Sequence, residues 1–536
     1  MKKTIPENWL FAVLLFVLVA VVYGQFLFNP PVFDDTILFM HGSGDVGQLG
    51  AFSPLQIRWL PYATMAWTVG AVDENMPWLR LEALLLHAAV GIALFFLLQN
   101  LYQWLPISGR SEKEIRLLAF CSACLFVLHP VAVYGAGYLI QRTIVMATLF
   151  GLLALLAYLR GLTGNRSVWL WVSVLFYGLA VLAKEHAVML PGVMLALTVL
   201  LSGLSANLFR RLRWIYLAFL LIALFVVFQK LGILGSVYEP KAGEMLEGID
   251  LGHAYPLSVL TQCALFFKYI WLWLVPNPAW MSADMREPFA TGLFSIFGLS
   301  TLAFIGYGMA AIRLLFRRGA MGVVGFAMLF PWLLFFTEFS AVRIQESFVL
   351  YRSYLWMTGI FIVLPLLLGK IKTGIAIPVT LVVILAFGIG AVNRLTTFSD
   401  PLLLWDDAAK LVGKKHELPG VWRIYENRAI AFLQLKRTQP AYQDYQLALS
   451  LAPPSGQKYL YQGLGAAYFQ DGRYAEALAS FGRALEIDGR YDQARYGRGL
   501  AHMLLGNRDA ALDDLSVVCK AGRRVACDKL ELIGKN

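Results

Sequence analysis

Long apolar stretches dominate the chain up to about residue 395, and most approach the roughly 20 residues that a membrane-spanning helix needs. We expect about eleven crossings, at residues 9–28, 79–101, 117–134, 138–159, 168–183, 187–202, 214–232, 291–312, 321–338, 353–369 and 373–392. The basic residues that flank these stretches fall on one side of the membrane only if residues 258–276 do not cross. We therefore expect 258–276 to form a re-entrant or surface-lying helix.

Charge also predicts the orientation. The positive-inside rule makes the side with Lys2, Lys3 and Arg110–Arg116 cytoplasmic. No small-residue cleavage site follows Lys2 and Lys3, so the first stretch is expected to be an anchor and not a removed signal peptide. An odd number of crossings puts the C-terminus on the outer side. Two outer segments, at about 29–78 and 233–290, are long enough to hold loop helices.

After residue 395 the long apolar runs stop and an internal repeat begins. Its copies start at Trp422, Lys458 and Asp492, spaced 458−422 = 36 and 492−458 = 34 residues apart. Small residues recur at two fixed positions of the copies: Ala429, Gly465 and Gly499, then Ala441, Ala477 and Ala511. Small residues let paired helices approach closely, and this period is typical of tetratricopeptide (TPR) repeats. The sequence thus predicts an all-α protein, with a polytopic membrane domain at 1–395 and a three-repeat TPR solenoid at 396–536.

Composition supports this division. The chain is 59% hydrophobic and 15% charged, with a mean hydropathy of +0.63, which excludes one large soluble enzyme and a disordered chain. The net charge is +11, and residues 400–536 hold 19 basic against 16 acidic residues, leaving 45−19 = 26 against 34−16 = 18 in the membrane part. Membrane anchoring explains that excess better than nucleic-acid binding does. Of five cysteines, Cys519 and Cys527 are both expected outside, either as a disulfide or as two free thiols.

Ionisable residues collect on the predicted outer side. They are Asp34, Asp35, Arg58, His129, Arg142, Lys184, Glu185, His186, Lys268, Arg343, Glu346 and Arg352. Such residues within or beside lipid are costly and usually mark a function. Two carboxylates and several cations in one cavity would suit a hydroxyl nucleophile with a phosphate leaving group. Loop solvation, lipid head-group pairing and salt bridges at helix ends are the alternatives, and His87 is expected to be a packed, hydrogen-bonded residue.

Several motifs, in order, resemble the transmembrane and tetratricopeptide-repeat (TMTC) O-mannosyltransferases, which have the GT-C glycosyltransferase fold. The motifs are VFDD at 32–35, RWLPYATMAWTVGAV at 58–72, LHPVAVYGAGYLIQR at 128–142 and LAKEHAVMLPGVML at 182–195. LTQCALFFKYIWLWLVP at 260–276 and YRSYLWMTG at 351–359 match more loosely. With the repeats, the resemblance covers nearly the whole chain.

The resemblance implies an inverting transferase that moves a sugar from a polyprenyl-phosphate carrier to Ser/Thr hydroxyls of an exported protein. Asp34 would be the general base, with Asp35 in reserve. The expected phosphate-binding residues are Arg58, Arg142, Lys184 and Arg352, then Lys268 and Arg343, supported by His129, Glu185, His186 and Glu346. No cofactor or metal is required, although a divalent metal at Asp34 and Glu185 stays open, as does the identity of the sugar.

The repeats would recruit the acceptor protein on a concave face that includes Tyr425, Tyr461 and Arg495. The compact loops indicate a bacterial inner-membrane protein whose repeats lie in the periplasm. Two alternatives remain: transfer to a lipid or envelope polysaccharide, and a non-catalytic scaffold for envelope or pilus assembly. A transporter is the least supported class, because no inverted hydropathy repeat is evident.

Overall fold

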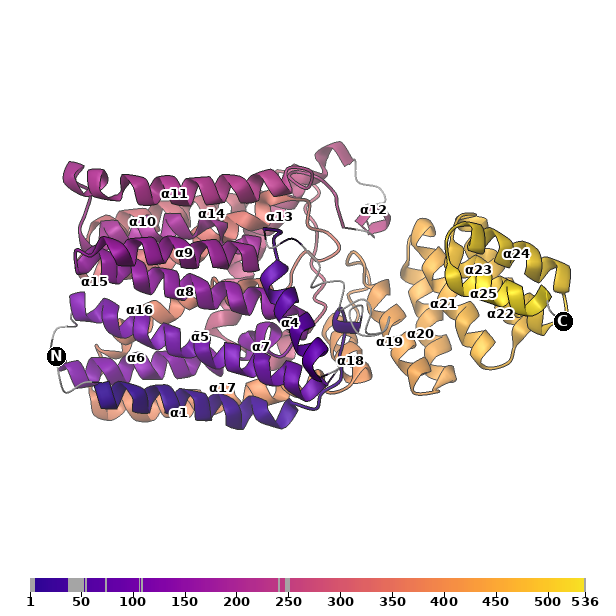
Figure 1. The fold of residues 1–536 in the computed structure, drawn as a ribbon, viewed down its shortest axis with the longest axis horizontal. Helices are drawn as coiled ribbons and strands as arrows, with labels where there is room; N and C mark the ends of the chain where they lie inside the picture. The colour runs from indigo at the N-terminus through magenta and orange to yellow at the C-terminus, as the bar shows by residue number, and fades with distance from the viewer. Residues whose placement is uncertain are drawn as a thin grey trace.

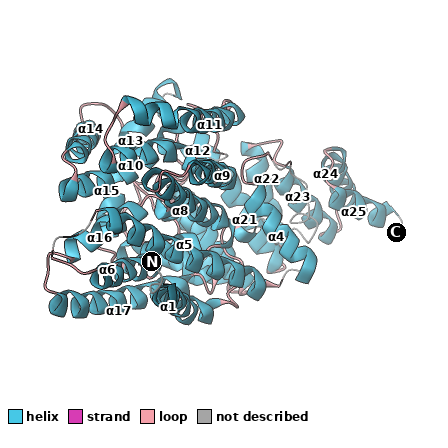
Figure 2. Ribbon diagram, turned by 60° about the vertical axis from the view of Figure 1, so that its left-hand side comes forward, coloured by secondary structure: helices cyan, strands magenta, loops and turns pink. Residues whose placement is uncertain are grey.

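The computed structural model describes residues 5–36, 53, 55–72, 75–105, 107, 109–239, 242–245 and 251–534. Lys2 and Lys3 lie outside the described residues. Every named element in these ranges is a helix, as Figure 2 shows, and the described residues add one isolated antiparallel bridge between Met285 and Phe348. The prediction of an all-α chain is therefore confirmed for this part of the protein.

A bundle of long apolar helices makes up the first part of the chain (Figure 1). Its helices are α1 (Ile5–Tyr23), α5 (Met76–Trp104), α6 (Glu112–Val127), α8 (Arg142–Thr163), α9 (Ser167–Ala183), α10 (Leu190–Leu201), α11 (Ala206–Lys230), α13 (Leu251–Leu274), α14 (Ile296–Phe316), α15 (Gly319–Phe335), α16 (Thr358–Leu368) and α17 (Thr373–Thr397). Most lie side by side with their axes roughly parallel. Their outward faces are rich in exposed Leu, Val, Phe and Trp side chains, as lipid contact requires.

Shorter helices connect them. They are η1 (Gly24–Phe26), α4 (Trp59–Val72), η2 (Pro130–Ala132), α7 (Val133–Ala136), η3 (Leu139–Gln141), η4 (Glu185–Met189), α12 (Ala242–Met245), η5 (Pro278–Trp280), η6 (Phe336–Ser340) and η7 (Leu350–Tyr354). In Figure 1, α4, α7 and α12 lie toward the end of the bundle that faces the C-terminal domain. We call this the repeat-facing end.

Eight helices of the described residues are long and apolar enough to cross a membrane, and α6 with η2 and α7 forms a ninth candidate bent by 52°. Three predicted crossings correspond to shorter apolar helices, at Ser167–Ala183, Glu185–Leu201 and Thr358–Leu368. The presence of several apolar candidate spans agrees with the sequence. The number of crossings, about eleven, stays a prediction.

Helix α13 covers the segment expected to be re-entrant or surface-lying, although its length and composition also suit a span. Gln262 and Trp273 donate hydrogen bonds to residues of the segment 339–353, which joins α15 to α16. After α13 the chain returns to the repeat-facing end, where the carbonyl of Met281 accepts from Arg394 near the end of α17. The re-entrant or surface-lying arrangement of this segment stays a prediction.

Basic residues mark the opposite end of the bundle. Arg110 donates to the carbonyl of Gly369, next to the first turn of α17, and pairs with Glu114 at 2.9 Å. Arg211 donates to the carbonyl of Gly161 at 2.6 Å. Since α17 has 25 residues, its two ends lie about 37 Å apart, a distance that exceeds the hydrocarbon thickness of a bilayer.

The C-terminal domain is a stack of antiparallel helix pairs. Its elements are α18 (Pro401–Val412), α19 (Trp422–Gln434), α20 (Thr438–Leu451), η8 (Pro454–Gly456), α21 (Gln457–Gln470), α22 (Tyr474–Ile487), α23 (Asp492–Leu504), α24 (Arg508–Lys520) and α25 (Arg524–Gly534). The pairs α19–α20, α21–α22 and α23–α24 correspond to the three predicted copies. A Cβ atom on Gly465 would lie 2.7 Å from the ring of Phe481, so only glycine permits this packing.

Candidate functional site

Six chain segments far apart in the sequence meet at the repeat-facing end of the bundle. They are the loop after α1, the start of α4, the junction of η3 and α8, the turn between α9 and η4, the segment after α11, and the segment from η6 to η7. They enclose a polar cavity of about 210 Å³. Its lining residues are Asp34, Arg58, Tyr62, Ile140, Gln141, Thr143, Lys184, His186, Tyr238, Arg343, Glu346, Tyr351 and Arg352. We call it the cationic cavity, because four of these residues are Arg or Lys and two are carboxylic acids.

Asp34 is the carboxylate that the first loop supplies to the cationic cavity. Its backbone N–H donates to the hydroxyl of Tyr138 at 2.8 Å, which fixes the loop against the bundle. The preceding residue, Phe33, has φ = 55°, a left-handed conformation that a bulky residue rarely adopts. Burial, followed by the charge of Glu346, raises the pKa of Asp34 to about 7. A carboxylate of this kind exchanges a proton near neutral pH.

Asp35 has a different role from its neighbour. It is fully buried, and its carboxylate accepts hydrogen bonds from the backbone N–H groups of Leu139 and Ile140, at 3.3 and 2.8 Å. Burial raises its pKa to about 6, although the nearby charge of Arg80 opposes the shift. Asp35 therefore holds the start of η3 in place and does not line the cationic cavity.

Lys184 is the cation of the cavity whose contacts are neutral side chains. Its Nζ donates to Gln141 Oε1 at 3.0 Å and Thr143 Oγ1 at 3.4 Å, and it lies 4.9 Å from the centre of the Tyr351 ring. Among the described residues it has no carboxylate oxygen within 4.0 Å. Burial, and then the charge of Arg58, lower the pKa of Lys184 to about 7. An anion bound in the cavity would restore its positive charge.

Two arginines of the cavity are held by carboxylates. Arg58, in a left-handed conformation with φ = 71°, makes a two-pronged ion pair with Glu185. Arg352 lies 3.1 Å from Glu338 and 3.0 Å from Glu346. Such pairing fixes both guanidinium groups in position before any ligand arrives.

The third arginine, Arg343, is less completely paired. One of its terminal N–H groups donates to the hydroxyl of Tyr238, and its Nε lies 3.7 Å from Glu338, beyond hydrogen-bond distance. Glu338 also accepts from His186 at 3.0 Å, so that His186 positions this carboxylate. The cavity therefore keeps donor capacity at Lys184 and Arg343, as binding of a phosphate group requires.

An apolar groove of about 410 Å³ adjoins the cationic cavity. Val188, Met189, Val226, Ile233 and Phe336 are among its apolar lining residues. The two hollows share Arg58, His186, Tyr238 and Arg343. A polar hollow and an apolar one therefore adjoin at these four residues.

A third hollow, of about 290 Å³, lies on the other side of Asp34. Its wall includes Trp405 of α18 and Arg423 of α19, so that the bundle and the first repeat share it. We call it the repeat cleft. Asp34 therefore contributes to the lining of both the cationic cavity and the repeat cleft.

Three of the predicted residues lie away from the cationic cavity. Arg142 points toward α4 and α5, where it pairs with Glu82 at 2.6 Å. Lys268 pairs with Glu287 and lines a separate groove beside α18. The ring of His129 is buried and lies 2.9 Å from the carbonyl oxygen of Trp273, which makes it a packing residue.

The sequence analysis missed three residues that shape the site. Glu338 was counted inside an apolar stretch, although the cost of a carboxylate beside lipid could have singled it out. Tyr351 and Arg423 gave no such signal, because tyrosine is common at membrane interfaces and arginine is common on repeats. His87 lies as expected, with its Nδ1 2.6 Å from the hydroxyl of Tyr354 and its Nε2 2.9 Å from the carbonyl of Val127.

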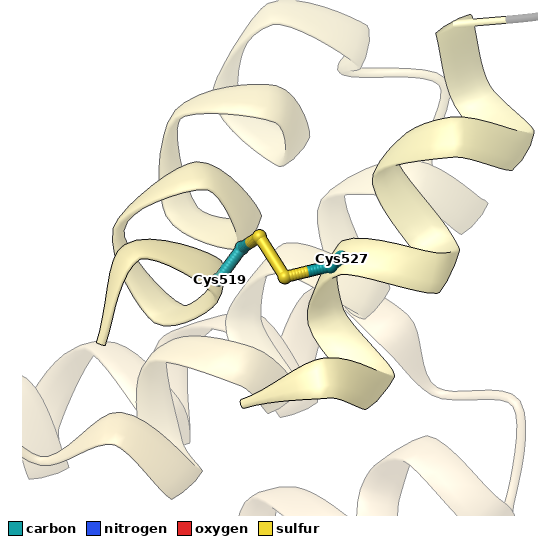
Figure 3. The surroundings of a disulfide bond; sticks show 2 residues. All are labelled: Cys519 and Cys527. Carbon is teal, nitrogen blue, oxygen red and sulfur yellow. A yellow bond between two sulfur atoms is a disulfide. The ribbon is translucent and has the colours of Figure 1, made fainter. Parts of the chain in front are cut away.

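The predicted acceptor-binding residues of the repeats are partly engaged within the solenoid. Tyr425 is buried, with its hydroxyl 3.4 Å from His416, and Arg495 pairs with Asp514 at 3.4 Å. Tyr461 is half-buried against the core of the second pair. Cys519 and Cys527 form a disulfide between α24 and α25 (Figure 3).

Metal binding was left open for Asp34 and Glu185. Within the described ranges, no group of three or more His, Cys, Asp or Glu side chains is arranged to hold a metal ion. Asp34 lines the cationic cavity and Glu185 lines the adjoining groove, where Arg58 occupies its carboxylate. The independence from metals stays a prediction.

A family model described as a TPR repeat matches residues 465–506. The match covers most of the second predicted copy and the first helix of the third, which confirms TPR repeats in the C-terminal domain. Comparison with curated proteins gives no match. A TPR repeat indicates protein–protein interaction.

Proposed function

We propose that this protein is a membrane glycosyltransferase of the GT-C class that transfers a sugar from a polyprenyl-phosphate carrier to a hydroxyl group of an exported protein. The motif resemblance to the TMTC group and the repeat domain support this class. A bacterial inner membrane, with the N-terminus in the cytoplasm and the repeats in the periplasm, is the matching location. The observation that carries the proposal is the position of Asp34, which shares one cavity with four cations beside an apolar groove.

The donor would bind with its phosphate in the cationic cavity and its isoprenoid chain along the apolar groove. Lys184 and Arg343 have the free donor capacity that a phosphate needs. Arg58 and Arg352 would supply further positive charge from fixed positions. Fixed cations of this kind stabilise the charge that develops on a leaving group.

In the reaction, the acceptor hydroxyl oxygen attacks the anomeric carbon of the sugar and forms the new C–O bond. The bond between that carbon and the phosphate oxygen breaks, and its electron pair leaves on the polyprenyl phosphate. The hydroxyl proton moves to the carboxylate of Asp34, which later releases it to water. Attack from the side opposite the phosphate inverts the anomeric configuration.

The raised pKa of Asp34 suits this role. A general base works best when its pKa lies near the operating pH, because it is then both available and basic enough. An exposed aspartate, with a pKa near 4, is a much weaker base. Asp35 is occupied by two backbone N–H groups, so we assign the base to Asp34.

The test is transfer of labelled sugar from polyprenyl-phosphate donors in membranes that contain either Asp34→Asn or the wild-type chain. We expect Asp34→Asn to lose about 10²–10⁴-fold in rate, the usual contribution of a general base. Asp513→Asn, at an exposed position of α24, is the matched control and should keep full activity. Undiminished transfer by Asp34→Asn would remove Asp34 from the mechanism. A scaffold function would gain support if only deletion of the repeats, and not Asp34→Asn, removed the cellular phenotype.

A further inference from the structure

The repeat cleft is built from both domains of the protein. The first loop contributes Phe33, Asp34 and Thr36, and α18 contributes Pro401 and Trp405. Helix α19 contributes five residues: Arg423, Asn427, Ile430, Ala431 and Gln434. The first repeat therefore supplies half of the lining of a cleft whose opposite wall carries Asp34.

The α19 residues form one continuous stripe. Arg423, Asn427, Ile430 and Gln434 are spaced at i, i+4, i+7 and i+11, which places them on a single face of the helix. The stripe is about 16 Å long at 1.5 Å per residue. An extended polypeptide rises about 3.3 Å per residue, so the stripe matches a segment of about five residues.

The stripe also has unused binding capacity. Ile430 is 41% exposed, although it points into a cleft between two domains. Gln434 is exposed as well. The Nε–H of Arg423 is buried and has no hydrogen-bond partner among the described residues. A buried donor without a partner is costly, and a carbonyl oxygen of a bound ligand would remove that cost.

From these observations we propose that α19 is one wall of the acceptor site and binds an extended Ser/Thr-containing polypeptide segment across from Asp34. Asn427 and Gln434 carry amide groups, which can both donate to and accept from a peptide backbone. Ile430, with Phe33 opposite, takes an apolar side chain of the segment. This inference rests on the proposed glycosyltransferase function and adds the acceptor class and its contacts.

A polysaccharide suits the cleft less well. Polysaccharide sites often offer an exposed aromatic face for the sugar rings to stack on, and Trp405 in the repeat cleft is only 5% exposed. The amide-bearing stripe, in a domain with a TPR repeat, favours a polypeptide. With a polypeptide in the repeat cleft and the donor phosphate in the cationic cavity, the hydroxyl group and the anomeric carbon meet at Asp34. The repeats would then complete the active site and would not only tether the acceptor.

The experiment compares Ile430→Glu with Leu435→Glu in the full chain in its native membranes. Both side chains are apolar and similarly exposed, at 41% and 47%, but Leu435 does not line the repeat cleft. Labelled polyprenyl-phosphate sugar is supplied, and two products are measured: sugar attached to membrane proteins and sugar released to water. Asn427→Ala, which removes one amide group without adding charge, is the second variant.

We expect Ile430→Glu to reduce protein labelling at least tenfold and to leave sugar release to water unchanged, while Leu435→Glu changes neither. Asn427→Ala should reduce protein labelling by a smaller factor, about threefold to tenfold. Unchanged protein labelling in both Ile430→Glu and Asn427→Ala would overturn the proposal that α19 lines the acceptor site. It would not overturn the proposed glycosyltransferase function. Label found only in lipid or polysaccharide would overturn the polypeptide assignment. Absence of both products from the wild type would overturn the proposed function itself.

Discussion

Two groups of cations have the same signature in the sequence and different surroundings in the structure. Arg58, Lys184, Arg343 and Arg352 line the cationic cavity together with Asp34. Arg142 and Lys268 were expected to join them, but each is paired with a carboxylate outside that cavity, Glu82 and Glu287 respectively. The comparison shows that position along the chain predicts which end of a bundle a charge occupies, whereas its carboxylate partners decide where it points.

The first prediction contrasts Arg352→Gln with Arg142→Gln and should give the largest difference. Arg352 lines the cationic cavity and also pairs with Glu338 and Glu346, so its loss removes positive charge, leaves Glu346 without its arginine and leaves Glu338 with only His186 and Arg343. We expect transfer to fall about 10²–10³-fold, the usual cost of one charge-stabilising group. Arg142→Gln should change the rate per folded molecule by less than about threefold, because Arg142 pairs with Glu82 and does not line the cationic cavity. Rates per folded molecule are measured in detergent after the folded fraction has been quantified. Equal losses of rate in Arg352→Gln and Arg142→Gln would contradict the prediction.

The second prediction uses the two lysines and should give an intermediate effect. Lys184→Gln removes the cation that lacks a carboxylate partner, and we expect a loss of about 10–100-fold in transfer. Lys268→Gln, whose partner Glu287 lies outside the cavity, should lose less than about threefold.

Lys184 also predicts a pH dependence of ligand binding. Its pKa, lowered to about 7, means that the free protein loses this positive charge as the pH rises through about 7. Affinity for polyprenyl phosphate should therefore fall with rising pH more steeply in the wild type than in Lys184→Gln. Binding of polyprenyl phosphate at several pH values tests this, and parallel curves for the two proteins would contradict it.

Much of the fold could be predicted from the sequence. The apolar stretches mark the helices of the bundle, and the small residues at fixed repeat positions mark the helix pairs of the solenoid. The buried Ala441, Ala477 and Ala511, each with no exposed surface, show why: a larger side chain there would separate the paired helices. Helix length was harder to predict. α9 agrees with its stretch, whereas α16 begins five residues later than the stretch at 353–369 suggests, because the first residues of that stretch belong to η7 and a turn.

The candidate site was only partly predictable. Residues from the loop after α1, the α9–η4 turn and the η6–η7 segment meet through tertiary contacts that no local pattern encodes. Adjacent Asp34 and Asp35 look equivalent in the sequence, yet one faces two hollows and the other accepts two backbone hydrogen bonds. The same limit applies to α19. Its stripe lines a cleft only because the loop that carries Asp34 packs near it, and no local pattern in the sequence predicts that contact.

The third prediction has the smallest effect and concerns the environment of Asp34 inside the cationic cavity. Asp34 must be ionised to accept a proton, so transfer at saturating donor, where the pH dependence of donor binding drops out, should rise as the pH increases through about 7. The negative charge of Glu346 is one cause of the raised pKa of Asp34, and it disappears in Glu346→Gln. The rising limb of the rate profile should therefore move to lower pH. Arg352, no longer paired with Glu346, would act in the same direction, because a free cation favours the carboxylate form.

The control for this shift is Glu287→Gln, which neutralises the carboxylate of the Lys268 pair outside the cavity. Its profile of rate against pH should match that of the wild type. A limb that stays in place in Glu346→Gln, or moves to higher pH, would mean that the titrating group is not Asp34 beside Glu346. Since the two substitutions remove the same charge from different surroundings, the pair of profiles separates an effect of the cationic cavity from a change in overall charge.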